Sequence, residues 1–223
     1  MRSAIFDLDG TLVDTSADLI AAANATLQAM GQGTPLDPVR DAATAFAGGR
    51  AMLRLGMQRR GLPADPDAID AQFAVFLDAY ETGIDRHSRP YPGAMEAVER
   101  LTAAGWRVGI CTNKPAHLAE LLMTRLGCRD AFAALVGADT LPVRKPDPAP
   151  YLECVRRLGG DPARSFLLGD TVTDRDTARA VGVPVALVAF GPEGPGISRL
   201  APDALLEHFD TLDMLAERLV PAA

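Results

Sequence analysis

The second part of the chain alternates between short apolar segments and amphipathic segments, and no other feature limits the possible folds as strongly. The predicted helices are GAMEAVERLTAAG, AHLAELLMTRLG, APYLECVRRLG and DTARAVG. The predicted strands that alternate with them are RVGICT, AALVGAD, SFLLGD and PVALVAF. Strands without polar alternation need cover on both faces, which helical crossovers provide in a parallel sheet. Because such crossovers are right-handed, we expect an α/β fold built on a doubly wound parallel sheet.

The first part of the chain has a different pattern. Residues 2–6 read as a short buried strand of the same sheet, whereas residues 15–87 show helical patterns and no convincing strand. Helices are predicted at about 15–31, at about 50–60 and in DAIDAQFAVFLDAYETG, whose apolar residues recur at helical spacing. We therefore expect residues 15–87 to form an inserted, small all-helical cap domain, lying as a lid above the C-terminal edge of the sheet. Residues 1–14 and 88–223 would form the α/β core.

Bulk properties exclude several classes of protein. A net charge of −7 argues against nonspecific binding to nucleic acid or to acidic membranes. No apolar run reaches the roughly 18 residues that mark a membrane helix, and a strand that begins near residue 3 leaves no room for a signal peptide. The three cysteines, without CxxC spacing, suit a reducing compartment and argue against structural zinc. We expect a cytoplasmic protein with no nucleic-acid or membrane partner, and leave monomer and homodimer open.

Polar side chains collect where several predicted strands end. They are Asp7 and Asp9 after the first strand, Thr112 and Asn113 after GIC, Lys145 just before a helix, and Asp170 with Asp174 after FLLG. Ligands bind at the carboxyl edge of open α/β sheets, so we expect these residues to converge there. Carboxylates as close as Asp7 and Asp9 repel each other and resist desolvation, and a bound cation would offset that repulsion.

This set of side chains suits phosphoryl transfer. Mg²⁺ prefers hard oxygen ligands, and it would both relieve the repulsion between carboxylates and attract a phosphate dianion. Thr112 and Lys145 could hold phosphate oxygens and neutralise developing charge. A carboxylate is a feasible nucleophile that would give an aspartyl-phosphate. A second aspartate could then protonate the leaving group and later activate water.

Four segments carry a resemblance to a known family. FDLDGTLVDT, CTNKP, RKPDP and GDTVTD resemble, in order and spacing, the motifs of the haloacid dehalogenase-like hydrolase superfamily, which has a Rossmann-like core. The resemblance covers essentially the whole chain. PYPG, TNKP and KPDPAP are typical of its phosphoglycolate phosphatase-like group, and the helical insertion resembles the family's first (C1) type of cap.

The resemblance implies a role for each residue of the motifs. Asp7 would be the nucleophile and Asp9 the general acid/base, while Thr112, Asn113 and Lys145 would be catalytic residues that hold the substrate phosphate. Mg²⁺ would be held by Asp7, by the backbone carbonyl of Asp9 and by Asp170, with Asp174 supporting. The substrate would be a small phosphorylated metabolite, with 2-phosphoglycolate the first choice.

Some residues near the motifs have simpler interpretations. Gly49 and Arg50, in AGGR, are candidates to bind the remote end of the substrate, although this segment could be a plain turn before a helix. Thr112 and Asn113, taken alone, would be read as a helix N-cap. Lys114 is expected to be solvated or to cap a helix rather than to act in catalysis. The histidines show no metal or triad spacing and are expected at the surface: His87, His117 and His208.

Other activities of the superfamily can be weighed by residue. Haloacid dehalogenases lack the second aspartate, so Asp9 argues against dehalogenation. Phosphonoacetaldehyde hydrolases need a cap lysine, and residues 15–87 contain none. A β-phosphoglucomutase-type sugar phosphomutase and a pyrophosphatase keep the same catalytic set and stay open. A non-catalytic regulatory module is less favoured because Asp7, Asp9, Lys145 and Asp170 are all present.

Overall fold

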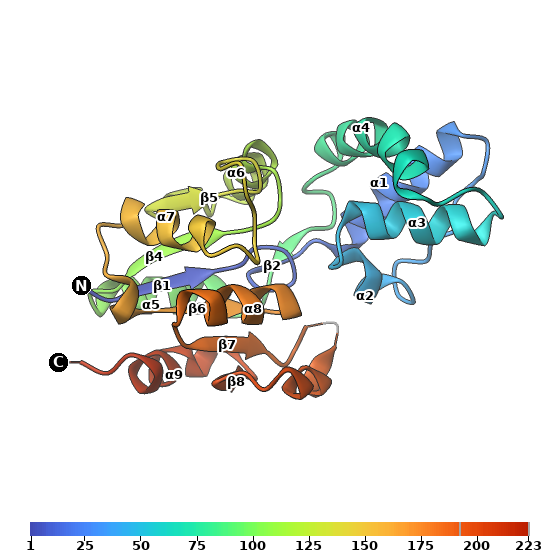
Figure 1. Ribbon diagram of the computed structural model, residues 1–223. Helices are drawn as coiled ribbons and strands as arrows, with labels where there is room; N and C mark the ends of the chain where they lie inside the picture. Colours follow the sequence, from blue (N-terminus) through green and yellow to red (C-terminus); the bar gives the residue numbers. More distant parts are fainter. Residues whose placement is uncertain (192, 223) are drawn as a thin grey trace. The chain divides into compact units, whose positions relative to one another are not determined.

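A computed structural model describes residues 1–191 and 193–222, and it divides the chain into two compact units. One unit consists of residues 1–13 together with residue 90 onward, and the other of residues 14–89. The chain passes between them twice, through β2 (Val13–Asp14) and β3 (Arg89–Pro90), which pair as a two-stranded sheet. Figure 1 shows the helices and strands that make up these units.

The larger unit is built on a six-stranded sheet whose pairings are all parallel, in the order β5-β4-β1-β6-β7-β8. The strands are β1 (Ser3–Phe6), β4 (Arg107–Cys111), β5 (Ala134–Val136), β6 (Ser165–Gly169), β7 (Val185–Val188) and β8 (Ala204–Leu206). In β1, β6 and β7 every residue is buried. The predicted doubly wound parallel sheet is confirmed, and β8 is an additional strand that the sequence reading did not include.

Helices cover both faces of this sheet. They are α5 (Ala94–Ala103), α6 (Ala116–Arg125), α7 (Ala149–Arg157), α8 (Val172–Val181) and α9 (Leu212–Leu219). Ile5 and Leu167 pack in one core cluster with Tyr151 of α7 and Ala178 of α8. Alternate residues of the same strands point to the opposite face, where Phe166 meets Trp106 edge to face at 5.7 Å. Burial on both faces explains why these strands are apolar throughout.

The smaller unit is helical, as predicted. It contains α1 (Ser16–Ala29), α2 (Ala42–Ala45), α3 (Gly49–Arg59) and α4 (Pro66–Thr82). Residues 15–87 are all described and contain no strand. α4 begins where the carboxylate of Asp65 accepts a hydrogen bond from the backbone N–H of Ala68, with Pro66 in the first turn. The short α2 was not predicted, because four residues carry too little periodicity to be recognised.

Glycines let the helices of this unit approach closely. A Cβ atom added to Gly49 would overlap the ring of Phe76, and one added to Gly56 would overlap the side chain of Leu27. Gly49 therefore has a packing role in its own unit. The segment AGGR is a turn that leads directly into α3, as its simpler interpretation expected, and its role in substrate binding stays a prediction.

Candidate active site

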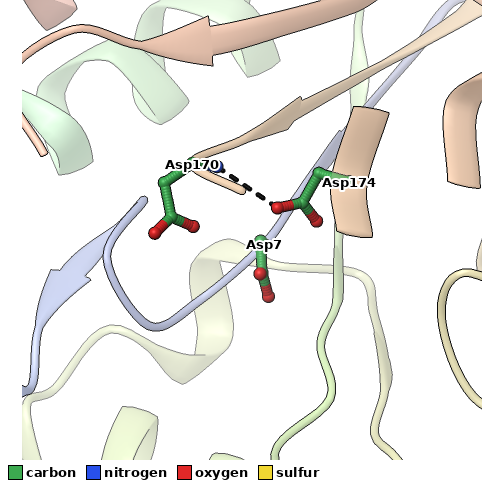
Figure 2. A group of neighbouring side chains, drawn as sticks. All are labelled: Asp7, Asp170 and Asp174. Carbon is green, nitrogen blue, oxygen red and sulfur yellow. Dashed lines mark hydrogen bonds between the residues drawn. The ribbon is translucent and has the colours of Figure 1, made fainter. Parts of the chain in front are cut away.

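Three aspartates meet beyond the carboxyl ends of the two central strands. Asp7 directly follows β1, and its backbone N–H donates to the carbonyl of Leu168 in β6 at 2.8 Å. Asp170 follows β6, and Asp174 lies in the first turn of α8. The three carboxylates each offer an oxygen, and these atoms lie within 4.8 Å of one another (Figure 2). The structure thus brings together residues that are more than 160 positions apart in the sequence.

Local sequence fixes Asp174 in this cluster. Thr171 is the N-cap of α8, and Asp174 is the N3 residue of a capping box. Oδ2 of Asp174 accepts hydrogen bonds from the hydroxyl (2.7 Å) and the backbone N–H (3.1 Å) of Thr171. A Cβ at Gly169 would overlap the Asp174 carboxylate, so only glycine fits there. Asp174 is consequently buried and has little freedom to move.

Lys145 lies between two of the carboxylates. Its ammonium nitrogen is 2.7 Å from Oδ1 of Asp174 and 3.1 Å from Oδ2 of Asp7, and its side chain is 1% exposed. Burial opposes a positive charge, but the charges of Asp174 and Asp7 outweigh it and raise the pKa of Lys145. Lys145 is therefore a cation held permanently beside Asp7. The amide of Asn113, an exposed residue, donates to the backbone carbonyl of Lys145 at 2.9 Å.

Burial disfavours the ionised form of two of the clustered acids, Asp7 and Asp170. Burial raises the pKa of Asp7 to about 6, with the charge of Lys145 acting against the shift and that of Asp174 adding to it. Burial, followed by the charges of Asp174 and Asp7, also raises the pKa of Asp170. Oδ1 of Asp170 accepts a hydrogen bond from Thr11 at 3.0 Å. A cation placed among these oxygens would favour the ionised carboxylates.

The donor set suits a hard divalent cation. Each of the three clustered side chains offers oxygen, the element that Mg²⁺ and Ca²⁺ prefer. Asp174 already accepts hydrogen bonds at both of its oxygens, from Lys145 and Thr171. Asp7 is likewise engaged at both oxygens, by the backbone N–H of Leu8 and by Lys145, so these contacts do not rank the three carboxylates. The assignment of Asp7 and Asp170 as metal ligands, with Asp174 supporting, stays a prediction.

Asp9 has a different partner from the other acids. The ammonium of Lys114 lies 2.8 Å from Oδ1 and 3.1 Å from Oδ2 of Asp9. The Lys114 side chain is only 3% exposed. The expectation that Lys114 is solvated or caps a helix is wrong, because this buried ammonium is ion-paired with the candidate acid/base. One signal could have found it: the chain has only two lysines, and both lie within the quoted motifs CTNKP and RKPDP.

Thr112 directly follows β4, at the same edge of the sheet, and its side chain is buried. Its backbone N–H donates to the carbonyl of Val136, and its hydroxyl accepts from the backbone N–H of Lys114 at 3.2 Å. The alternative reading as an N-cap is wrong, because α6 has Pro115 at that position. The carboxylate of Asp139 serves the first turn of α6 instead, accepting from the N–H of Ala116 at 2.7 Å.

Arg50 belongs to the helical unit and has partners within it. Its Nε donates to Oδ1 of Asp70 at 2.8 Å, and its guanidinium lies 3.7 Å from the centre of the Phe73 ring. The Arg50 and Asp70 side chains are 45% and 57% exposed. Arg50 is therefore held in one direction by side chains of α4 while it stays accessible to solvent.

The three histidines are exposed, as predicted. Among the described residues, no helix combines the length and apolar character that crossing a membrane requires.

Comparison with known proteins identifies the family. Residues 1–182 match the family model for haloacid dehalogenase-like hydrolases. The chain belongs to this family. The resemblance noted in the sequence is thereby confirmed, and the protein is an enzyme of the haloacid dehalogenase-like hydrolase class.

Relatives of this hydrolase match along nearly its whole length. A protein of Mesorhizobium japonicum named phosphoglycolate phosphatase is 41% identical, covering 98% of this chain and 96% of its own length. A protein of the same name from Agrobacterium fabrum is 38% identical over 97% and 93% of the two chains. A crystal structure described as a predicted phosphoglycolate phosphatase from Haemophilus somnus superposes with a TM-score of 0.84 over 96% of this chain and 97% of its own. At 24% identity, this last match supports the fold alone.

Proposed function

We propose that this hydrolase removes phosphate from small phosphomonoesters with the help of Mg²⁺, and that 2-phosphoglycolate is its substrate. The observation that supports this choice of substrate is the identity to two proteins named phosphoglycolate phosphatase, 41% and 38% over nearly the full chain. The chemistry is supported by the carboxylate of Asp7 lying between a buried lysine and two further acids.

Asp7 acts as the nucleophile in this proposal. One of its carboxylate oxygens attacks phosphorus, the bond from phosphorus to the ester oxygen breaks, and Asp7 carries the phosphoryl group. The fixed charge of Lys145 favours the ionised form of Asp7 and attracts the phosphate oxygens, with Thr112 and Asn113 as further phosphate ligands. Mg²⁺, held by Asp7, the backbone carbonyl of Asp9 and Asp170, would supply charge neutralisation for the phosphate.

Asp9 acts as the acid and then as the base. Its carboxylic acid gives a proton to the departing ester oxygen, so that an alcohol leaves. The resulting carboxylate takes a proton from water, which attacks phosphorus and releases inorganic phosphate from Asp7. The first half leaves Asp7 phosphorylated and Asp9 deprotonated, and the second half restores both residues, so atoms and charges balance over one turnover.

The helical unit acts as the cap that selects the substrate. The aspartates and Lys145 belong to the other unit and recognise only phosphate and metal, so they cannot distinguish glycolate from a sugar. Gly49 and Arg50 at the start of α3 are the proposed substrate-binding residues of the cap. Phe73 and Asp70 hold the guanidinium of Arg50, which can pair with the carboxylate of the substrate at its terminal nitrogens.

The decisive experiment measures phosphate release by the purified protein. We expect turnover of 2-phosphoglycolate with Mg²⁺ and none in excess EDTA. Asp170→Asn should weaken Mg²⁺ binding measured by calorimetry, whereas the exposed Asp130→Asn should not. Turnover of pyrophosphate or isomerisation of β-glucose 1-phosphate, without phosphoglycolate hydrolysis, would contradict the proposed substrate. Full activity in excess chelator would contradict the metal.

We also propose a cytoplasmic location and a monomer or homodimer as the working form. The three cysteines are free and buried, which fits a reducing compartment. Light scattering on the purified protein would give its mass in solution, and a species larger than a dimer would contradict this part of the proposal.

A further inference from the structure

The ion pair between Lys114 and Asp9 joins two loops at the edge of the sheet. Asp9 belongs to the turn after β1, and Lys114 follows β4, the strand that pairs directly with β1. The ammonium contacts both carboxylate oxygens, at 2.8 and 3.1 Å. Contact with both oxygens restricts the rotation of the carboxylate plane more than a single hydrogen bond would.

The backbone on both sides of this pair is fixed. In the turn of Asp9, the backbone N–H groups of Leu12 and Val13 both donate to the carbonyl of Leu8 at 3.0 Å. At Lys114, the backbone N–H donates to the Thr112 hydroxyl, and the carbonyl accepts from Ala138 at 2.9 Å. The ammonium is therefore presented to Asp9 from a rigid support.

The two lysines of the chain contact different acids. Lys145 contacts Asp7 and Asp174, whereas Lys114 contacts Asp9. The proposed nucleophile and the proposed acid/base thus each have their own buried cation. A charged group as buried as Lys114 loses most of its hydration, which makes its position depend on the carboxylate that it faces.

We propose that Lys114 is a positioning residue that orients the carboxyl group of Asp9 toward the leaving-group oxygen. The proposal rests on the proposed phosphatase function, in which Asp9 protonates that oxygen. Lys114 itself gives up no proton and forms no bond to the substrate. It acts only through Asp9, by limiting the orientations in which the acid can reach the departing oxygen.

This role predicts a dependence on the leaving group. An alkyl phosphate such as 2-phosphoglycolate expels a strongly basic alkoxide unless it is protonated, whereas an aryl phosphate with a nitro substituent expels a stable phenolate. Loss of orientation at Asp9 should therefore slow the alkyl ester far more. The quantity to compare is kcat/KM, because it reports the steps up to formation of the phosphorylated enzyme and excludes its later hydrolysis.

The experiment compares wild type, Lys114→Met and Lys114→Arg on 2-phosphoglycolate and on p-nitrophenyl phosphate. We expect Lys114→Met to lower kcat/KM by about 100-fold on the alkyl ester and by less than about 5-fold on the aryl ester. Lys114→Arg, which keeps a cation, should recover much of the loss. Lys114→Gln offers a second neutral variant if Lys114→Met does not fold, as judged by circular dichroism.

A double-mutant cycle separates positioning from any other role. In an Asp9→Asn background, Lys114→Met should change kcat/KM on the alkyl ester by less than about 3-fold, because the acid that Lys114 orients is already gone. Equal losses on both esters, or a full additional loss in the Asp9→Asn background, would overturn the positioning role alone. Absence of turnover of either ester by the wild type would instead overturn the proposed function together with it.

Discussion

The ammonium of Lys145 lies 2.7 Å from Oδ1 of Asp174, and neither side chain is more than 1% exposed. Removal of one member of such a pair leaves the other as an isolated buried charge, which is far more costly than loss of an exposed ion pair. The pair between Lys145 and Asp174 therefore stabilises this edge of the sheet and is also part of the candidate site.

Lys145→Met should strongly destabilise the protein. We expect a loss of about 3–5 kcal/mol in the free energy of unfolding, measured by urea titration at neutral pH in the presence of chelator. The matched control is Arg199→Met, which removes a solvent-exposed ion pair with Glu193. It should change the free energy of unfolding by less than about 1 kcal/mol. Equal effects of the two substitutions would show that Asp174 is not left uncompensated.

Gly169→Ala should disturb Asp174 without changing any charge. The added methyl group would overlap the Asp174 carboxylate, so we expect a loss of about 1–3 kcal/mol in stability. Phosphatase activity should also fall, because Asp174 supports Lys145 and the metal site. Gly196→Ala is the matched control, since a Cβ there meets no atom within 4 Å. Wild-type stability and activity in Gly169→Ala would show that the site tolerates a shifted Asp174.

In the helical unit, Asp41 should make stability depend on pH. Two hydrogen bonds from Arg59 hold the pKa of Asp41 below its usual value of 3.8, against the effect of burial. The folded form thus binds the proton less tightly than the unfolded chain, so the pair stabilises the fold above about pH 4 and this contribution fades at lower pH. Because Arg59 is partly exposed, we expect about 1 kcal/mol.

The measurement for this pair is the difference in unfolding free energy between wild type and Asp41→Asn across acid pH. The difference should shrink as the pH falls from about 5 to about 3. Asp70→Asn, which removes an exposed ion pair with Arg50, should show little difference at any pH. A difference for Asp41→Asn that stays constant down to pH 3 would contradict the lowered pKa.

Arg50 should affect only substrates that carry a carboxylate. Arg50→Ala should remove a bidentate pair with the substrate carboxylate, which should cost about 2–3 kcal/mol in transition-state binding. This cost corresponds to a loss of roughly 30- to 150-fold in kcat/KM for 2-phosphoglycolate. An aryl phosphate without a carboxylate should lose much less in Arg50→Ala. Arg54→Ala, at an exposed position of the same helix, is the control. Similar losses on both substrates would show that Arg50 does not bind the carboxylate.

The sequence predicted the sheet because its strands are apolar on both faces. This pattern can be recognised in each segment of the sequence without knowing which strands lie beside it. It did not predict β8, because the short apolar run Ala204–Leu206 between Asp203 and Glu207 fits a helix as well as a strand. Convergence of Asp7 and Asp170 followed from the rule that strand ends share one edge. The pairing of Lys114 with Asp9 did not follow, because it depends on how far a flexible side chain reaches between two loops.

Side-chain partners within the helical unit were also beyond the sequence. Arg50 and Asp70 lie twenty positions apart on different helices, and only the packing of α3 against α4 brings them together. Gly49 could be recognised as a residue of interest, but its close approach to Phe76 requires the positions of both helices. Motif residues are therefore more predictable than the contacts that orient them.

The central claim is that Asp7 becomes phosphorylated, and acid quenching of the working enzyme tests it most directly. Wild type mixed with 2-phosphoglycolate and Mg²⁺, quenched within a few turnovers and digested, should give a peptide that carries one phosphoryl group on Asp7. Asp7→Asn should give no such peptide and should lose at least about a thousandfold in kcat, or roughly 4 kcal/mol in barrier height. Activity of Asp7→Asn within about tenfold of wild type, or a phosphoryl group trapped on another residue, would contradict the claim.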